Sequence, residues 1–221
     1  MSDSSTPVPT AELLAEGLHD WVLAERWLHA RFATPDYVSG LALVVAIGDA
    51  AESADHHPDV TLRHGHVEVH LRSHDVGDLT RRDLRLAHRI TELAAEHGAE
   101  ARPASVRLQS LALDASDLAA VGRFWSAAYT GSPDHVDGND VIDPDTHELL
   151  LWLQPTDPHA EPRQRFHVDL WVAPEAAPDR IAAILDAGGT LVSDAEAPSF
   201  TVLADPEGNK LCICTCLDRQ P

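Results

Sequence analysis

The second half of the chain repeats one order of elements, and this repeat limits the fold more than any other feature. Hydrophobic patterns predict a strand, an amphipathic helix and further strands over 106–154, and again over 165–217. Such a duplication, with little identity between the copies, indicates two packed βαβββ units. The expected strands are 106–114, 148–154, 165–173, 190–194, 200–204 and 210–217, and the expected helices are 118–129 and 178–187.

A helix is expected over 36–55 in the first half of the chain. Thr34 fits the N-cap position and Pro35 fits the first helical position, while Pro58 prevents the helix from continuing. The apolar residues that recur at helical spacing are Tyr37, Leu41, Val44, Val45 and Ala51.

A β-hairpin and a second helix are expected next. Strands over 60–62 and 67–71 flank a turn at His64-Gly65, and apolar residues alternate along the second strand. Thr80 then begins an amphipathic helix that ends near Gly98. The hairpin is therefore expected to present one apolar face.

Histidines and carboxylates gather around this hairpin. Glu52, His56, His57, His74 and Asp83 fall within about thirty residues. Imidazole gives and takes protons near neutral pH, so a group of imidazoles beside carboxylates is what a dehydration or proton-shuttling site requires. The set is therefore interpreted as a candidate active site.

The end of the first helix is expected to favour a charged histidine. Glu52 and His56 are four residues apart and are predicted to share the last turn. The negative end of the helix dipole and the Glu52 carboxylate both favour protonated His56, which indicates a general acid.

Structural explanations exist for the same residues. Thr80 and Asp83 have the spacing of a capping box, and His56-His57 fits a solvated helix end. A strand-face metal site is an alternative for the histidines of equal parity, His64, His66, His70 and His74. Gly65 is expected to break that strand, and no thiolate or carboxylate completes a ligand set. Each histidine alone fits a structural role better, but the set together favours an active site.

Residues 10–98 resemble pterin-4a-carbinolamine dehydratase. That family's signature is an acidic residue, three residues, His-His-Pro, an aromatic residue further on, and then a histidine and an aspartate. The matching residues are Glu52, His56, His57, Pro58, His74 and Asp83, with Trp21, Arg31-Phe32 and Tyr37 at earlier landmarks. Two positions depart from the pattern, because His64 stands where an aromatic is usual and Asp78 where a glycine is common.

The resemblance implies an α+β fold in which a small antiparallel sheet carries helices on one face. It implies loss of water from 4a-hydroxytetrahydropterin to give the quinonoid dihydropterin, with the pterin as substrate, no cofactor, and a homo-oligomeric protein. His56 and His74 are expected to act as acid and base, in an order that the sequence leaves open, with Glu52 and Asp83 orienting and tuning them. The residues implied to bind the substrate are His57, Pro58 and His64.

Residues 105–217 resemble the glyoxalase-like branch of the vicinal-oxygen-chelate superfamily. The matching residues are Asp114, Phe124-Trp125, 166–170, 188–190 and 205–209. Metal-bearing members take ligands from the first, fourth, fifth and last strands, and the residues at or near those positions are Gln109, Gln154, His167 and Cys212. Only His167 is a good ligand among them, so no metal is expected, and His167 is interpreted as a pocket or core histidine.

Composition excludes some partners. The formal net charge of −20 over 221 residues argues against nucleic acid or an anionic membrane surface. No apolar run is expected to span a membrane, and residues 1–9 are expected to form a disordered tail without signal-peptide features.

Cys212, Cys214 and Cys216 alternate along one strand, where disulfide geometry is poor, so reduced, packed thiols in a cytoplasmic protein are expected.

The expected domains are residues 10–98 and 105–217, joined by a linker over 99–104. Two alternatives to the dehydratase are left open. One is a protein that binds a small molecule or serves assembly without catalysis. The other is a metal-dependent lyase or dioxygenase whose site lies in the second domain. Fold alone does not decide among these functions, because function belongs to sites.

Overall fold

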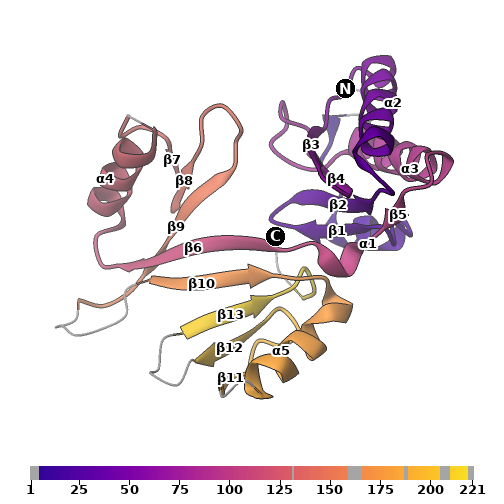
Figure 1. Ribbon diagram of the computed structural model, residues 1–221. Coiled ribbons are helices and arrows are strands. Elements are labelled where there is room, and N and C mark those ends of the chain that lie inside the picture. Colours follow the sequence, from indigo (N-terminus) through magenta and orange to yellow (C-terminus); the bar gives the residue numbers. More distant parts are fainter. Residues whose placement is uncertain (1–4, 131, 159–165, 187–188, 205–209, 219–221) are drawn as a thin grey trace. The chain divides into compact units, whose positions relative to one another are not determined.

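The computed structural model describes residues 5–130, 132–158, 166–186, 189–204 and 210–218. The chain forms two compact units that meet in sequence at Val106 and Arg107 (Figure 1). Each unit is described below by itself.

The N-terminal unit has an antiparallel sheet with helices on one face. Its strands are β1 (Trp21–Ala24), β2 (Trp27–Ala33), β3 (Asp59–Arg63), β4 (His66–Leu71) and β5 (Glu100–Ala101). The order is β1-β2-β4-β3, and β5 pairs with the end of β2. The helices are α1 (Thr10–Ala15), α2 (Tyr37–Ala54) and α3 (Arg81–Glu96). This is the α+β arrangement that the sequence predicted.

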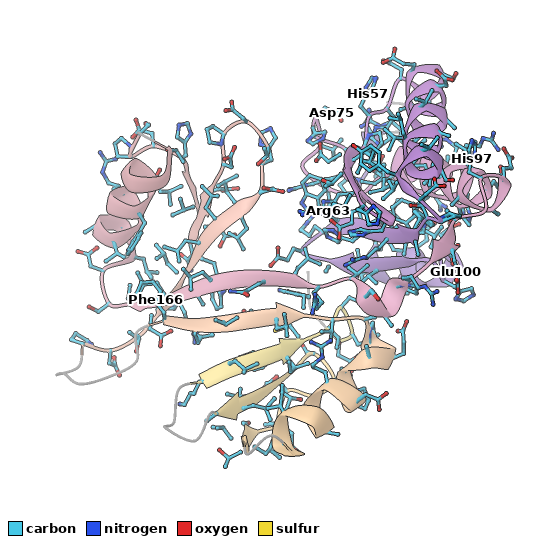
Figure 2. The ribbon with its side chains drawn as sticks, viewed as in Figure 1. His57, Arg63, Asp75, His97, Glu100 and Phe166 are labelled. Atoms are coloured by element: carbon cyan, nitrogen blue, oxygen red, sulfur yellow. The ribbon has the colours of Figure 1, made fainter. Side chains whose placement is uncertain are left out.

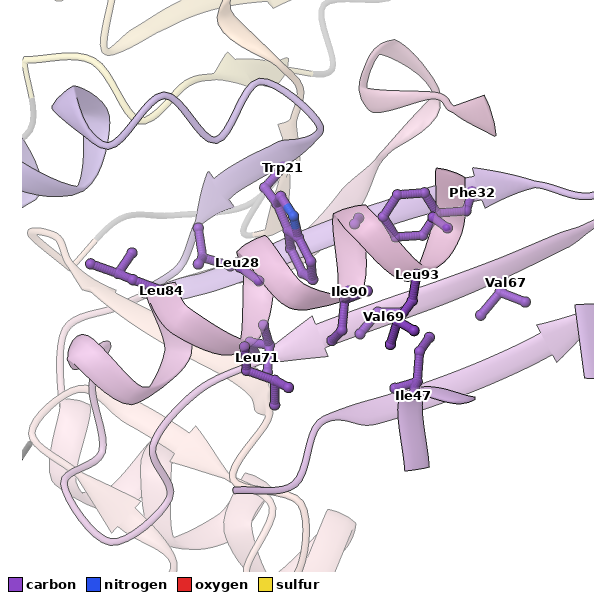
Figure 3. Packing of buried hydrophobic residues seen from close by; sticks show 14 of the residues in the cluster. Trp21, Leu28, Phe32, Ile47, Val67, Val69, Leu71, Leu84, Ile90 and Leu93 are labelled. Carbon is purple, nitrogen blue, oxygen red and sulfur yellow. The ribbon is translucent and has the colours of Figure 1, made fainter. Parts of the chain in front are cut away.

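Strict alternation along the central strand β4 separates two faces of this sheet. On β4, Val67, Val69 and Leu71 are fully buried, whereas the residues between them point to the other face. Figure 3 shows the apolar face packed against α3, and Ile47 of α2 belongs to the same cluster. The core residues labelled there are Trp21, Leu28, Phe32, Ile47, Val67, Val69, Leu71, Leu84, Ile90 and Leu93.

Helix α2 begins later and faces differently than expected. Asp36, not Thr34, is the N-cap, because its carboxylate accepts a hydrogen bond from the backbone N of Ser39 at 2.8 Å. The buried residues are Gly40, Leu43, Ile47 and Ala51, whereas Tyr37, Leu41 and Val45 are about half exposed.

A glycine explains which face of α2 packs on the sheet. A Cβ at Gly40 would lie 2.7 Å from Cδ1 of Leu62 on β3, so the missing side chain lets the helix approach the sheet. Because apolar residues of α2 occupy most faces of the helix, their spacing alone did not identify the buried face.

Among the residues that the structure describes, α2 is also the one helix long and apolar enough to cross a bilayer by length and composition. This differs from the expectation that no apolar run reaches that length. Leu43 and Ile47 of α2 lie fully buried in the core of the unit, so the helix packs as one of its core elements.

Both ends of the N-terminal unit are more ordered than the sequence indicated. Val8, inside the expected tail, is buried in the core, and its backbone N donates to the carbonyl of Leu79 at 2.8 Å. The expected linker 99–104 contains β5, and the backbone N of Arg102 donates to the carbonyl of Arg31. This segment therefore belongs to the first unit.

The C-terminal unit contains the two predicted βαβββ modules. The first is β6 (Leu108–Ala115), α4 (Leu118–Thr130), β7 (Val136–Asp137), β8 (Asp140–Ile142) and β9 (Leu149–Pro155). The second is β10 (Phe166–Trp171), α5 (Ala177–Asp186), β11 (Thr190–Ser193), β12 (Phe200–Ala204) and β13 (Lys210–Cys214). The short strands β7 and β8 were not predicted.

One sheet runs through both modules in the order β11-β12-β13-β10-β6-β9-β8-β7. The modules join through the antiparallel pair β6–β10. Each helix covers its own module, because α4 packs on the cluster around Leu151 and Leu153, and α5 packs on the cluster around Leu203 and Ile213. The opposite face of the sheet carries a mixture of polar and apolar side chains, among them His167 and Asp169 of β10 and Trp152 of β9.

The three cysteines are buried and none forms a disulfide. Cys212 and Cys214 lie on β13 and point to the same face, whereas Cys216 follows the end of the strand. They pack as small side chains, as the sequence predicted.

Candidate active site of the N-terminal unit

His56 and Asp83 form a buried pair. Nε2 of His56 lies 2.7 Å from Oδ1 of Asp83, and the residues are 6% and 0% exposed. His56 follows the end of α2, and Asp83 lies in the first turn of α3. The pair therefore joins segments that are 27 residues apart in the chain.

Further hydrogen bonds hold Asp83 ionised. Oδ2 of Asp83 accepts from Oγ of Ser73 and from the backbone N of Thr80, both at 2.7 Å. Burial by itself raises the pKa of Asp83, but the hydrogen bonds from His56, Ser73 and Thr80 outweigh it and lower the pKa below its usual value. Asp83 therefore has both a structural and a site contact, because it completes the capping box of α3 and also binds His56.

This pairing determines which nitrogen of His56 is available. An ionised Asp83 can only accept a hydrogen bond, so Nε2 of His56 carries the hydrogen and donates it, which fixes the tautomer of a neutral His56. Nδ1 of His56 makes no hydrogen bond with the residues that the structure describes, so Nδ1 is the nitrogen left for a further partner.

The partner of His56 differs from the one expected. Helix α2 ends at Ala54, and Asp55 takes a left-handed conformation with φ of 48°. This residue turns the chain, so His56 leaves the helical face and points inward instead of lying beside Glu52. Glu52 contacts His57 instead, with Oε1 3.0 Å from Nε2. Both side chains of this second pair are largely exposed, at 80% and 58%.

His74 is exposed on the loop after β4, and its ring lies edge-on to Trp27 with 5.7 Å between ring centroids. The Arg72 guanidinium lies over the same indole, 5.4 Å from the ring centre. His74 directly follows Ser73, which donates to Asp83. This short path places the His74 segment beside the His56–Asp83 pair.

Arginine contacts hold the loop that carries His74. Arg72 donates to the carbonyl of Gly77 at 2.5 Å, and Arg82 lies 2.5 Å from the Asp75 carboxylate. Arg26, in the turn between β1 and β2, forms an ion pair with Asp78. Asp78, one of the two departures from the family pattern, therefore ties this loop to the first hairpin.

The expected site residues divide into two groups. His56, His57, Pro58 and the His74 segment lie at the end of the β3–β4 hairpin where Asp59 pairs with His70. Figure 2 shows His57 and Asp75 at this end and Arg63 away from it. His64 lies in the turn at the opposite end, about 16 Å away along β3 at the usual rise per residue. The structure therefore does not bring His64 to the cluster.

Two residues of the site were missed by sequence reasoning. Ser73 connects the His74 segment to Asp83, and Trp27 contacts the His74 ring. The parity of Trp27 on β2, opposite to buried Leu28 and Phe32, was a signal for the second residue. No sequence signal indicated Ser73, because its partner lies on a different element.

The sheet face away from the helices carries another histidine pair. The rings of His29 and His70 are 4.7 Å apart between centroids, and Nδ1 of His29 is buried without a hydrogen-bond partner. Burial and the neighbouring His70 lower the pKa of His29 from 6.5 to about 3. No three metal-ligating side chains in the described part of this unit come close enough to hold a metal ion. The alternative of a metal site on one strand face is therefore wrong for the described residues.

The residues expected at the metal positions of the C-terminal unit do not converge as a set. Gln109 pairs with Leu170 on β10, so it points to the sheet face opposite His167, which pairs with Ala112. Gln154 on β9 pairs with Asp114 on β6. His167 lies near Asp114 and Asp169, with 3.7 Å and 3.6 Å between the closest atoms.

Comparison with known proteins matches each unit to a protein-family model. Residues 6–93 match the family model described as pterin 4 alpha carbinolamine dehydratase, and residues 110–214 match the model of a glyoxalase-like domain. A Koribacter versatilis protein, named provisionally as a pterin-4-alpha-carbinolamine dehydratase, is 32% identical over 85 residues, which are 38% of this chain and 90% of that protein. A protein from Aquifex aeolicus with the same provisional name is 35% identical over 81 residues, 37% of this chain and 82% of the relative.

Among solved structures, a protein from Brucella melitensis described as a transcriptional coactivator/pterin dehydratase aligns with a TM-score of 0.39 and 20% identity, over 40% of this chain and 99% of that one. The chain belongs to the pterin-4-alpha-carbinolamine dehydratase family through its N-terminal unit, and its C-terminal unit is a glyoxalase-like domain.

Proposed function

We propose that the N-terminal unit removes water from 4a-hydroxytetrahydropterin and releases the quinonoid dihydropterin. The observation that carries this proposal is the buried path from Ser73 through Asp83 to His56. It orients one imidazole and places the segment of a second imidazole next to it. The family membership supports the same chemistry.

The reaction needs two proton transfers. Hydroxide is a poor leaving group, so the 4a oxygen must receive a proton before it departs as water. A ring nitrogen of the pterin must lose a proton for the new double bond to form. A positioned acid and a positioned base each contribute about 10²–10⁴-fold to such a step.

The environments of the two histidines favour different roles. The ionised Asp83 carboxylate stabilises the imidazolium that forms when Nδ1 of His56 takes up a proton, so His56 acts as the base. His74 is exposed beside Trp27 and acts as the acid that protonates the leaving oxygen. His57, whose exposed side chain pairs with Glu52, binds the substrate.

A stopped-flow assay of carbinolamine dehydration with the full chain tests these roles. His56→Ala and His74→Ala should each lower the rate by about 10²–10⁴-fold. His88→Ala is the matched control, because His88 is a half-exposed histidine on α3 that contacts Glu16 instead of the cluster. Unchanged turnover in both site variants would eliminate the proposed chemistry.

We also propose that the protein forms a homo-oligomer through α2. This helix exposes Tyr37, Val38, Leu41 and Val45, and Val38 alone is 74% exposed. Apolar side chains grouped on one helix face are costly to leave in water and are covered by a second copy. Sedimentation of the full chain should show a dimer or a larger assembly, and a monomer at micromolar concentration would rule this out.

A further inference from the structure

The loop that carries His74 is tightly closed on itself. The backbone N of Ser73 donates to the carbonyl of Asp78 at 3.1 Å, so the two ends of the loop are bridged. The carbonyl of Ser73 accepts from the backbone N of Val76 at 3.1 Å and of Gly77 at 2.9 Å. Gly77 has a φ of 68°, which a glycine adopts without strain. In a loop this short and closed, the contacts that hold its end also set the direction of the His74 ring.

Asp78 anchors the end of this loop to the turn between β1 and β2. Oδ1 of Asp78 accepts from the backbone N of Leu79 at 2.8 Å, and Oδ2 accepts from the Arg26 guanidinium. The Asp78 side chain is only 12% exposed. A carboxylate with so little water around it is unfavourable unless a cation and hydrogen bonds compensate it. Arg26 therefore holds Asp78 in place, and with it the loop.

Arg26 keeps this contact although its backbone is strained. Glu25 and Arg26 both have positive φ, at 50° and 63°, where a residue with a Cβ is less stable than glycine. Strain of this kind persists where the surrounding structure requires it, and it gathers at functional sites. A glycine at position 26 would relieve the strain but would lose the ion pair with Asp78.

Trp27, the next residue, contacts His74 directly. The two rings meet edge-on, with 76° between their planes and 5.7 Å between their centroids. Trp27 is buried, and the Arg72 guanidinium covers a face of its indole, 5.4 Å from the ring centre. Arg72 also donates to the carbonyl of Gly77 at 2.5 Å, which joins the indole to the loop. His74 is thus exposed to solvent but rests against a ring that is itself fixed.

We propose that Arg26 and Trp27 are positioning residues for the dehydration reaction, because they hold His74 where it delivers its proton. Arg26 acts through Asp78, and Trp27 acts by ring contact. This inference rests on the proposed function, in which His74 is the acid. An acid must lie within hydrogen-bonding reach of the leaving oxygen, and a displacement of about 1 Å can lower a rate on the order of 10²-fold. Because Asp78 stands where glycine is common in the family, the Arg26 anchor goes beyond the family pattern.

Stopped-flow dehydration by the full chain tests both residues. Arg26→Gln and Trp27→Leu should each lower kcat by about 10–100-fold. KM should stay nearly the same, because the acid acts in the chemical step. Arg26→Lys keeps the charge and Trp27→Phe keeps an aromatic ring, so both should retain most of the rate. Arg89→Gln is the matched control, because Arg89 is an exposed arginine that pairs with glutamates of its own helix, and its rate should equal that of the native chain.

The same substitutions in a His74→Ala chain separate positioning from general damage. Residues that act through His74 should have no further effect once its imidazole is gone, whereas a damaged fold would slow both chains. The pH profile gives a second check. The rate of the native chain should fall on the alkaline side as protonated His74 is lost, and this limb should weaken in Arg26→Gln.

Fluorine NMR of the full chain, labelled with a fluorinated tryptophan, follows the contact without turnover. The Trp27 resonance is the one missing from Trp27→Phe. It should shift as His74 titrates, and the shift should be smaller in Arg26→Gln and absent in His74→Ala. Circular dichroism checks that each variant folds, and Arg26→Gln carries the test if Trp27→Leu does not fold.

The outcomes distinguish this inference from the proposed function. If His74→Ala slows dehydration but Arg26→Gln and Trp27→Leu do not, the positioning roles are wrong and the dehydratase assignment stands. Equal losses from Arg26→Gln in the native and His74→Ala chains would also overturn the positioning role. A native chain that does not dehydrate the carbinolamine would overturn both proposals.

Discussion

The buried His29 makes the stability of the N-terminal unit sensitive to mild acid. Its pKa is about 3 in the folded protein against 6.5 for an unperturbed histidine, because burial and His70 disfavour the charged ring. The unfolded chain therefore binds more protons below pH 6.5. Because the unfolded chain gains these protons first, the free energy of unfolding has its full value above pH 6.5 and decreases as the pH falls toward 3.

The size of this effect follows from the two pKa values. With 6.5 for the unfolded chain and about 3 for the folded one, lowering the pH from 7 to 5 removes about 2 kcal/mol of unfolding free energy. Replacing His29 by Phe keeps a ring of similar size and removes the titrating group, at the cost of the 3.3 Å contact between Nε2 and the carbonyl of Ala24. Between pH 7 and pH 5, the unfolding free energy of the variant should therefore fall by about 2 kcal/mol less than that of the native protein.

Urea unfolding of both proteins at pH 7, 6 and 5, followed by tryptophan fluorescence, measures the difference. The transition that His29→Phe changes belongs to the N-terminal unit, which separates it from unfolding of the second unit. If native protein and variant lose the same free energy between pH 7 and pH 5, His29 is not the group responsible, and the assigned burial of a neutral ring is wrong.

Three further changes test the packing, the site and the assembly. Asp83→Asn should lower dehydration at least 10²-fold, measured by stopped flow, because the amide no longer stabilises the imidazolium of His56; an equal pH profile and rate would contradict this. Gly40→Leu should lower the unfolding free energy by about 1–3 kcal/mol in thermal or urea melts, because the site is filled by Leu62. Gly48→Leu on the same helix meets open space and should not lower it. Val38→Glu should shift sedimentation toward the monomer, and an unchanged assembly would place the interface elsewhere.

The β1–β2 hairpin shows why part of the fold could not be predicted. Its turn consists of Glu25 and Arg26, both with positive φ, at 50° and 63°. Hairpin turns of this kind usually carry Asn or Gly, and neither is present, so no turn signal marked the hairpin. The short strands β7 and β8 escaped prediction because two or three residues leave no measurable alternation.

The candidate site was predictable in its members but not in its pairings. Spacing and residue type identified Glu52, His56, His57, His74 and Asp83. The sequence assigned Glu52 to His56 because they are four apart on a helix, but the left-handed Asp55 ends the helical path first. Asp83 became the partner because α3 places its first turn beside the end of α2.

Local patterns along the chain were sufficient to determine the types of the longer elements after residue 36, the duplicated order of the second unit and the residues able to move protons. These depend on periods of two and 3.6 residues and on side-chain chemistry, which are properties of short segments. Packing alone decided that Gly40 faces the sheet, that Ser73 joins Asp83, and that Asp169 lies beside Cys212. Such contacts join residues far apart in sequence, and they depend on strand register and helix approach, which no single segment contains.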